Sequence, residues 1–383
     1  MRALVWKGVG KVAVEDVPRP AIGAPHEAIV KITSTTICGS DMHLYHASIP
    51  AMRKGDILGH ECMGIVDEVG AGVEHLHVGD RVVVSAVIAD GTCWYCRQGL
   101  FSACERTNRN VLVEEMYGAA TGGIFGYSHL TGGYPGGQAE YIAVPYADVN
   151  TLKVPASLPD DKVLLLSDVV CTGWHATELG RVEKGQTVAV WGCGPIGLMA
   201  QEWARFRGAS QVVAVDRIGY RLEVAASRGA VAVNFDEEDV IERTKELTDG
   251  RGPDVCIEAV GFRYVKSLHH RVQKTLKLET DSIDALNECI RSCRKYGWVS
   301  IVGDFMGHAN QFPIGALMEK GLQAGSGQVH VQRYWHDLLA AIERGEFDPT
   351  FVISHRWPLE RAAAAYDMFD GKEDNALKVV LTP

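Results

Sequence analysis

The sequence contains no apolar run long enough to cross a membrane as a helix. It also lacks a basic stripe, and its 383 residues carry a formal net charge of -10. These two absences argue against membranes and nucleic acids as partners. Residues 1–6 read as a first strand without the apolar segment of an export signal, so we expect a cytoplasmic protein.

The ten cysteines therefore do not indicate a disulfide framework, because such frameworks belong to exported chains. We interpret them as reduced thiols and metal ligands. Cys289 and Cys293 lie one helical turn apart, and the simplest interpretation is that they are buried thiols on one helix face.

The length favours two domains, since single cores seldom grow this large. Up to about residue 155 the sequence consists of short strand-like segments separated by glycines, which predicts an antiparallel, barrel-like β domain. Alternating strand and helix patterns follow and predict a doubly wound parallel sheet. We place the first domain at residues 1–157, completed by 310–383 with a last strand at 377–381, and the second at 158–309.

Residues 37–43 combine a thiol, a hydroxyl, a carboxylate and an imidazole where a predicted strand over 26–36 opens into a loop. The triplet Gly59-His60-Glu61 follows further along the chain. Zinc binds thiolate and imidazole well, and a catalytic zinc needs three protein ligands and one open position. Cys38 and His60 supply two of these ligands, so a third has to come from elsewhere.

An apolar run at residues 164–166 ends in Ser167 and Asp168. A buried acidic side chain is costly unless it is paired, and a metal ion would compensate its charge. The alternative is that Asp168 caps a helix beginning near Thr172.

A second cysteine motif occurs at residues 90–104. Cys93 and Cys96 have the spacing of a structural zinc site, Cys104 is a candidate third ligand, and Asp90 lies where a fourth ligand would fit. Carboxylate is a harder ligand for zinc than thiolate. We favour a structural zinc with three Cys ligands and one Asp over a metal-free lobe.

The strand predicted at residues 187–191 leads into Gly192-Cys193-Gly194-Pro195-Ile196-Gly197, and a helix follows. The next strand ends in Asp216. In this context the glycine motif predicts a dinucleotide site whose pyrophosphate lies at the helix N-terminus. Asp216 would accept hydrogen bonds from the adenosine ribose and repel a 2′-phosphate, which favours NAD over NADP, although Arg217 could soften that preference.

Two further segments have no assigned structure. Residues 110–137 are rich in glycine and aromatic residues, which could line a substrate channel or a subunit contact. Residues 262–282 form an extra segment that is either a solvated surface insertion or a flap over the cofactor.

Together these motifs resemble those of the zinc-containing, medium-chain alcohol dehydrogenases over the whole chain. The resemblance depends on residues 38–43, residues 59–61, the lobe with Cys93, Cys96 and Cys104, and Gly192-x-Gly194-x-x-Gly197. Within that family the chain is similar to the glutathione-independent formaldehyde dehydrogenase and dismutase branch. That likeness is carried by residues 136–141, 145–148, 166–168 and the segment after Gly261.

The resemblance implies an α/β enzyme with a GroES-like β-barrel catalytic domain, a Rossmann domain and an active site in the cleft between them. It implies Cys38 and His60 as ligands of a catalytic zinc and Asp168 as the third. The chain departs from the family at Asp90, where the structural zinc normally has a fourth Cys.

The resemblance also suggests roles for neighbouring residues. We expect Ser40 to take the alcohol proton and pass it through the ribose to His43, and Glu61 to tune the zinc coordination. Thr172 and Val260 are expected near the nicotinamide. The full predicted set of cofactor-binding residues is Thr172, Gly192, Gly194, Pro195, Ile196, Gly197, Asp216, Arg217, Arg221 and Val260.

Three functions are weighed. The first is a reversible oxidoreductase that interconverts a small alcohol and an aldehyde or ketone with exchangeable NAD. The second is an aldehyde dehydrogenase or dismutase with tightly bound NAD, which a flap at 262–282 would favour. The third, a non-catalytic NAD-binding relative, is disfavoured by the intact set Cys38, Ser40, His43, His60 and Asp168. The family likeness implies a homodimer or homotetramer.

Overall fold

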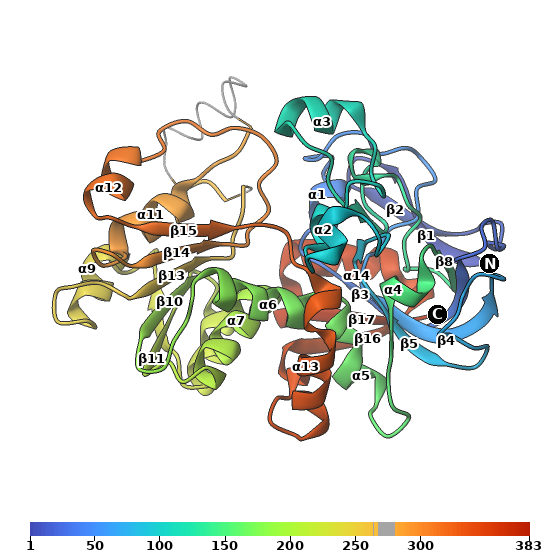
Figure 1. Cartoon of the computed structure of the whole chain (residues 1–383). Coiled ribbons are helices and arrows are strands. Elements are labelled where there is room, and N and C mark those ends of the chain that lie inside the picture. The colour runs from blue at the N-terminus through green and yellow to red at the C-terminus, as the bar shows by residue number, and fades with distance from the viewer. Residues whose placement is uncertain (263, 267–279) are drawn as a thin grey trace. The chain divides into compact units, whose positions relative to one another are not determined.

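The computed structural model describes residues 1–262, 264–266 and 280–383 (Figure 1). It divides into two compact units, one made of Met1–Cys171 and Val329–Pro383 and the other of Thr172–Gln328. These limits differ from the predicted domain limits at residues 157 and 309. The first border falls inside helix α6 (Val169–Leu179), which is a single continuous helix.

The first unit is built on a seven-stranded sheet in the order β16-β17-β3-β4-β5-β9, with β8 also paired to β3. Its pairs are antiparallel except β16 with β17. The strands are β3 (Ala28–Ile37), β4 (Cys62–Val69), β5 (Arg81–Val84), β8 (Tyr141–Val144), β9 (Thr151–Lys153), β16 (Ile353–Pro358) and β17 (Lys378–Thr382).

Strand β3 is the centre of this sheet. It pairs with β4 along one edge, and β8 and β17 pair with different halves of its other edge. Alternate residues such as Ala28, Val30 and Ile32 face one buried core, as the two-residue period of a strand requires. The end of β3 therefore receives chain segments from far along the sequence.

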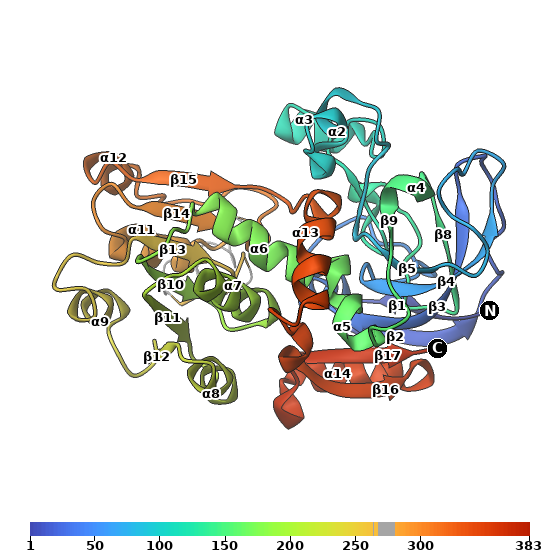
Figure 2. The same ribbon diagram turned by 60° about the horizontal axis from the view of Figure 1, so that its bottom comes forward.

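Smaller elements complete the first unit (Figure 2). Two antiparallel ribbons join β1 (Arg2–Gly8) to β2 (Lys11–Asp16) and β6 (Val87–Ile88) to β7 (Gly123–Ile124). Its helices are α1 (Asp41–Tyr45), α2 (Trp94–Arg97), α3 (Val111–Tyr117), α4 (Ala147–Asn150), α5 (Asp160–Val163), α13 (Val331–Glu343) and α14 (Ala362–Gly371).

The glycine-rich segment 110–137 contains regular structure, with α3, β7 and a short 3-10 helix at His129–Thr131. Phe125 belongs to the hydrophobic core of the main sheet. Tyr127 is buried, and its ring lies edge-on to His60 with the ring centroids 6.2 Å apart. The two aromatic residues thus have different environments.

The second unit contains the predicted doubly wound parallel sheet, in the order β12-β11-β10-β13-β14-β15. The strands are β10 (Thr187–Trp191), β11 (Gln211–Asp216), β12 (Val231–Asn234), β13 (Val255–Glu258), β14 (Trp298–Ile301) and β15 (Gln323–Ser326). Its other described helices are α7 (Pro195–Phe206), α8 (Gly219–Ser227), α9 (Val240–Glu246), α11 (Asp284–Ser292) and α12 (Ile314–Glu319).

Both faces of this sheet are covered by helices. Ala189 and Trp191 of β10 pack in one hydrophobic cluster with residues of α9 and α11. Val190 faces the other way, toward Gly197 of α7. The strand order reverses between β10 and β13, and in such sheets ligands bind beyond the carboxyl ends of the strands at that point.

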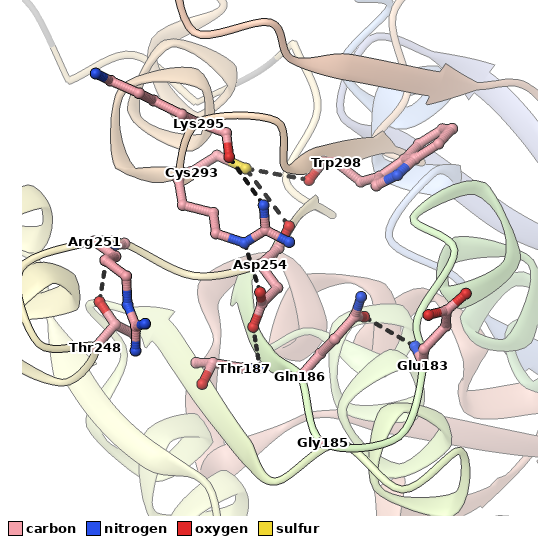
Figure 3. Close-up of polar contacts among 12 residues, drawn as sticks. Glu183, Gly185, Gln186, Thr187, Thr248, Arg251, Asp254, Cys293, Lys295 and Trp298 are labelled. Atoms are coloured by element: carbon pink, nitrogen blue, oxygen red, sulfur yellow. Dashed lines mark hydrogen bonds and ion pairs between the residues drawn. The ribbon is translucent and has the colours of Figure 1, made fainter.

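Polar contacts join neighbouring strands at their amino-terminal ends, on the side of the sheet opposite to the expected ligand site (Figure 3). Asp254 accepts a hydrogen bond from the Thr187 backbone N–H at 2.8 Å and pairs with the Arg294 guanidinium at 2.6 Å. The Cys293 thiol is buried as predicted and donates to the Trp298 carbonyl at 3.5 Å. These contacts therefore connect the first residues of β10, β13 and β14, whereas a ligand is expected beyond the carboxyl ends of the strands. The prediction that Cys293 shares a helix face with Cys289 was wrong, because α11 ends at Ser292.

The predicted flap or surface insertion at residues 262–282 lies mostly outside the described residues. Within the ranges that are described, no helix has both the length and the apolar character needed to cross a membrane.

Candidate metal centres and dinucleotide site

Two clusters of metal-binding side chains occur in the first unit. The Cys38 cluster consists of Cys38, His60, Glu61 and Asp168, and its four donor atoms lie within 4.8 Å of one another. The Cys93 cluster consists of Asp90, Cys93, Cys96 and Cys104 and meets the same limit. Both groups were predicted from the sequence as zinc sites.

Strand pairing brings the Cys38 cluster together. Cys38 follows the last residue of β3, and His60 and Glu61 immediately precede β4, which pairs with β3 through Thr35 and Cys62. Asp168 follows a fully buried 3-10 helix, Leu164–Ser167, whose Leu166 carbonyl accepts a hydrogen bond from the Trp335 indole at 2.9 Å. Helix α6 begins at Val169, directly after Asp168 and earlier than predicted.

Carboxylates lie on both sides of the His60 imidazole. Its Nδ1 lies 3.4 Å from Asp41 Oδ1, while its Nε2 lies 3.6 Å from Asp168 Oδ2 and 3.3 Å from Ser40 Oγ. Burial opposes protonation of His60, but Asp168, Asp41 and Cys38 outweigh burial and raise its pKa. Metal-binding histidines commonly turn their second nitrogen toward such a carboxylate, which leaves Nε2 as the donor here.

Asp41 is itself held in place. It accepts hydrogen bonds from the Cys38 N–H at 2.9 Å and from Gln138 Nε2 at 3.1 Å. The Gln138 carbonyl accepts a hydrogen bond from the Tyr366 hydroxyl at 2.8 Å. A chain of buried polar contacts thus runs from the end of β3 to α14.

Ser40 lies beside the cluster, with its Oγ 3.3 Å from His60 Nε2, and His43 follows it in α1. Ser40 is half-buried and precedes α1, and the His43 N–H donates to the Ser40 carbonyl at 3.0 Å. His43 is 8% exposed. The Ser40 hydroxyl next to His60 is thus followed, one helical turn later, by the His43 imidazole.

Glu61 has a cationic partner that the sequence analysis missed. Its Oε2 accepts a hydrogen bond from the Thr36 hydroxyl and forms an ion pair with the Lys378 ammonium. Both side chains of the ion pair are 0% exposed. Burial lowers the pKa of Lys378, but Glu61, Cys38 and Asp168 together outweigh burial and raise it. A single lysine in the apolar strand at 377–381 was the available signal.

The Cys93 cluster is a compact group in which three thiols contact one another. Cys93 Sγ lies 3.4 Å from Cys96 Sγ and 4.0 Å from Cys104 Sγ, and Cys104 Sγ lies 3.4 Å from Asp90 Oδ1. All four side chains are buried. A hydrogen bond from Cys96 lowers the pKa of Cys104 to about 5.

Asp90 is a well-satisfied carboxylate within this group. Burial disfavours its charged form, but hydrogen bonds from Thr92 and the Cys93 N–H outweigh burial and hold its pKa below the usual range. Arg106 pairs with its second oxygen at 3.0 Å. Asp90 therefore stays ionised and can serve as a metal ligand.

The glycine motif forms the turn between β10 and α7. Gly192 has a φ of +93°, and a side chain on it would collide with Ala259 and Val260. A Cβ on Gly197 would lie 1.8 Å from the Gly192 carbonyl oxygen, so only glycine permits this approach of helix and strand. Pro195 and Ile196 occupy the first turn of α7, where proline costs no hydrogen bond.

Gly194 differs from the other two glycines. Its missing Cβ would point into open space, with the Arg221 guanidinium 3.9 Å away as the one neighbour within 4 Å. Open backbone beside a cation at a helix N-terminus fits a pyrophosphate. Thr172 lies on α6, whose Gly173 packs against Met199 of α7.

Asp216 closes β11 as predicted. One carboxylate oxygen accepts from the Cys193 N–H at 2.7 Å, and the other accepts from the N–H groups of Arg217 at 2.7 Å and Ile218 at 3.1 Å. The carboxylate therefore joins the glycine turn to the end of the next strand.

Comparison with known proteins assigns the family. Residues 24–156 match the alcohol dehydrogenase GroES-like domain, and residues 195–278 match the zinc-binding dehydrogenase family. A zinc-type alcohol dehydrogenase-like protein of Schizosaccharomyces pombe is 43% identical over 382 residues, covering 99% of this chain and 90% of the relative. The zinc-type alcohol dehydrogenase-like protein AdhB of Bacillus subtilis is 43% identical over 387 residues, with full coverage of both.

A formaldehyde dehydrogenase is also among the relatives, as the resemblance of the sequence motifs suggested. The glutathione-independent formaldehyde dehydrogenase of Pseudomonas aeruginosa is 37% identical over 272 residues, covering 68% of this chain and 65% of that protein. Among solved structures, the alcohol dehydrogenase TADH from Thermus sp. ATN1 superposes with a TM-score of 0.85 at 37% identity, covering 100% of this chain and 99% of that one.

This chain belongs to the zinc-type alcohol dehydrogenases of the medium-chain family. It is accordingly a zinc-dependent oxidoreductase that interconverts an alcohol and a carbonyl compound with a nicotinamide cofactor. Two structural relatives, each 25% identical, were solved with different cofactors, NADH in an Escherichia coli enzyme and NADP in one from Sinorhizobium meliloti.

Proposed function

We propose that the chain oxidises a small alcohol reversibly with NAD, using a catalytic zinc held by Cys38, His60 and Asp168. The observation that carries this proposal is the convergence of their donor atoms within 4.8 Å. One thiolate, one imidazole and one carboxylate suit zinc, and three protein ligands leave one position for a substrate. The residues present therefore fit the ion that the family requires.

When bound, the zinc would supply a Lewis acid that polarises the substrate oxygen. The protein side chains do the rest. The Asp41 carboxylate would favour a proton on His60 Nδ1, from which its Oδ1 lies 3.4 Å away, and would leave Nε2 for the ion. Asp168 is presented by the buried 3-10 helix that precedes it. Ser40 Oγ lies 3.3 Å from His60 Nε2 and would accept the proton of a substrate hydroxyl. The proton would then pass through the cofactor ribose to His43 of α1.

We assign Glu61 to an accessory role at this site. Its carboxylate belongs to the Cys38 cluster but is already engaged by Thr36 and Lys378. It therefore tunes the coordination of the ion without serving as a permanent ligand.

NAD is the preferred cofactor in this proposal. The Asp216 carboxylate, fixed by three backbone N–H groups, would repel a 2′-phosphate, while its remaining lone pairs suit ribose hydroxyls. Gly192, Gly194, Pro195, Ile196 and Gly197 would cradle the pyrophosphate with Arg221. Thr172, Arg217 and Val260 complete the proposed contacts. Replacing Asp216 by Ser should raise kcat/KM with NADP relative to NAD, measured from initial rates with both cofactors.

We further propose a structural zinc in the Cys93 cluster. Three thiols and one ionised carboxylate form a closed, buried set of four ligands with no place for a substrate. This ion would stabilise residues 90–104 and take no part in turnover.

A second candidate function is dismutation of an aldehyde with NAD that stays bound. The similarity to the Pseudomonas aeruginosa formaldehyde dehydrogenase favours it. Stoichiometric NAD in the purified protein, together with aldehyde turnover without added cofactor, would select this function over ordinary alcohol oxidation.

The main test combines metal analysis with activity. We expect two zinc ions per chain and NAD-dependent oxidation of short primary or secondary alcohols. Activity should disappear when a chelator removes the ion held by Cys38, His60 and Asp168, and it should return when zinc is added. Full activity in zinc-free protein would refute the proposed site.

A further inference from the structure

Lys378 is unusual because a lysine side chain is seldom fully buried unless it is paired. It is 0% exposed and is among the largest fully buried side chains of the described chain. Its ammonium forms an ion pair with Glu61 Oε2, which also accepts the Thr36 hydroxyl hydrogen bond. No other ion-pair partner of Lys378 occurs in the described part of the chain.

The sheet register explains how these three side chains meet. Val380 of β17 pairs with Thr36 of β3, and Thr36 N donates to the Glu61 carbonyl across the other edge of β3. Cross-strand neighbours share one face of a sheet, as do residues two apart in a strand. Lys378, Thr36 and Glu61 therefore point to the same side of β3, beside Cys38.

Within the Cys38 cluster, the Lys378 ammonium also offsets part of the negative charge of the donors. The Asp41 carboxylate beside His60 Nδ1 is not one of these donors and is counted separately. The Cys38 thiolate and the carboxylates of Glu61 and Asp168 carry three negative charges, and the Lys378 ammonium reduces the sum to two. A divalent ion balances that sum. Without the ammonium, the third anion would have no compensating charge except the ion itself.

Glu61 has the means to become a ligand. Its Oε1 is buried and has no hydrogen-bond partner among the described residues, and a Glu61 carboxylate oxygen lies within 4.8 Å of the other three donor atoms. A buried carboxylate released from Lys378 would move toward the nearest remaining positive charge. In the proposed catalytic site that charge is the zinc.

We propose that Lys378 holds the Glu61 carboxylate off the ion and thereby keeps the fourth coordination position open for the substrate oxygen. Lys378 is a positioning residue that acts through Glu61, and this inference rests on the proposed catalytic zinc. A merely structural ion pair would leave ligand access to the ion unchanged.

The test uses the full chain with Co(II) in place of zinc, and imidazole as a small ligand for the open position. Binding is followed in the visible absorption of the cobalt. Lys378→Met should weaken imidazole binding by about tenfold or more, because Glu61 competes for the same position. The same variant should lose its ion to a chelator more slowly than the unmodified protein.

Two controls separate positioning from folding. Lys378→Arg keeps the charge and should bind imidazole like the unmodified protein. In Lys378→Met/Glu61→Gln the competing carboxylate is gone, so imidazole affinity should recover. If Lys378→Met does not fold, Lys378→Gln, which retains a hydrogen-bond donor for Glu61, should show a smaller loss in the same direction.

The inference is overturned if the neutral variants bind imidazole unchanged, or if the double variant is as weak as Lys378→Met. These failures leave the zinc site intact. Absence of any thiolate–cobalt absorption that Cys38→Ser removes is a different result, because it eliminates the Cys38 cluster as a metal site and the proposed function with it. Cys38→Ser is needed as the reference because the three thiols of the Cys93 cluster also absorb when cobalt is bound.

Discussion

In the Cys93 cluster all four donors come from residues 90–104, whereas the Cys38 cluster gathers its donors from the ends of β3 and β4 and from the helix before Asp168. The first contains three thiols and a satisfied carboxylate. The second has one thiol, one imidazole and two carboxylates, with a half-buried hydroxyl beside them. Under the proposed function, the Cys93 cluster would hold a structural ion with all four positions filled by the protein. The Cys38 cluster would hold an ion with one position open for the substrate.

The environment of each aspartate shows the same contrast. Asp90 accepts hydrogen bonds from Thr92 and Cys93 and pairs with Arg106, so its own segment compensates its charge. Asp168 lies 3.6 Å from His60 and depends on a partner far away in the sequence. Removing a donor of the Cys93 cluster should therefore affect the stability of residues 90–104. Removing a donor of the Cys38 cluster should affect catalytic activity.

The largest expected effect is that of Asp168→Ala. It removes one of the three proposed catalytic ligands, so kcat/KM should fall by more than about 100-fold, since even partners that only orient ligands are worth 10–100-fold. Zinc content should drop by one ion per chain while the melting temperature changes little. Asp161→Ala, which alters a carboxylate paired with Arg356 near the same helix, is the matched control and should keep both activity and zinc. Unchanged turnover in Asp168→Ala would remove this residue from the site.

The second effect is loss of the other ion in Cys96→Ser. A structural zinc contributes directly to folding, and its loss should cost on the order of 3 kcal/mol. Protease cleavage within residues 90–104 should become faster, while the remaining folded enzyme keeps its kcat. Cys289→Ala, a buried thiol outside both clusters, should keep two zinc ions. An unaltered zinc content in Cys96→Ser would mean that the lobe is metal-free.

Glu258 sharpens the comparison, because among the described residues this buried carboxyl has neither an ion-pair partner nor a place in a metal-binding cluster. Glu258 accepts hydrogen bonds from the N–H groups of Val260 at 2.9 Å and Gly261 at 2.8 Å, and burial raises its pKa from 4.5 to about 7. The folded protein then binds the proton more tightly than the unfolded chain. Its stability contribution therefore decreases as the pH rises from 4.5 through 7.

Glu258→Gln should remove this pH dependence. When the pH is raised from 4 to 8, the free energy of unfolding of the unmodified protein should fall by about 3 kcal/mol more than that of the variant. Denaturant unfolding at several pH values measures the difference. Glu246→Gln, at a side chain that is 66% exposed, should show no such trend. Parallel curves for Glu258→Gln and the unmodified protein would contradict the assigned pKa.

The smallest effect is expected for Asp90→Cys, which gives the lobe four thiolates. Thiolate is the softer ligand, so the second zinc should be lost to a chelator several-fold more slowly while turnover stays the same. Asp90→Asn removes the charge without adding a thiolate and should release zinc faster. Faster release from both variants would show that the hydrogen bonds of Asp90, rather than its ligand type, hold the lobe together.

Much of this arrangement was predictable because it lies in short motifs. The glycine turn, the end of β11 at Asp216 and most of the donors follow from residue type and spacing. Asp168 as the third ligand followed only from the family resemblance, since its position also suited a helix cap. The helix after Asp168 was predicted to begin near Thr172, but it begins at Val169 because its first turn continues the buried apolar segment. Phe125, considered for a channel or a subunit contact, belongs to the core of the main sheet.

The partners of the donors were not predictable in the same way. Lys378, Gln138 and Tyr366 reach the Cys38 cluster only through the pairing of β17 and β3 and the packing of α14. A single sequence does not contain that register. The lone lysine in an apolar strand was a sign of a buried charge, but its partner depended on which strands are neighbours.

The most direct test of the account is anomalous scattering at the zinc absorption edge from crystals of the purified protein. We predict two peaks per chain, one between Cys38 Sγ, His60 Nε2 and the Asp168 carboxylate and one among Asp90, Cys93, Cys96 and Cys104. A map with zinc in the lobe and none beside Cys38, His60 and Asp168 would contradict the proposed catalytic site.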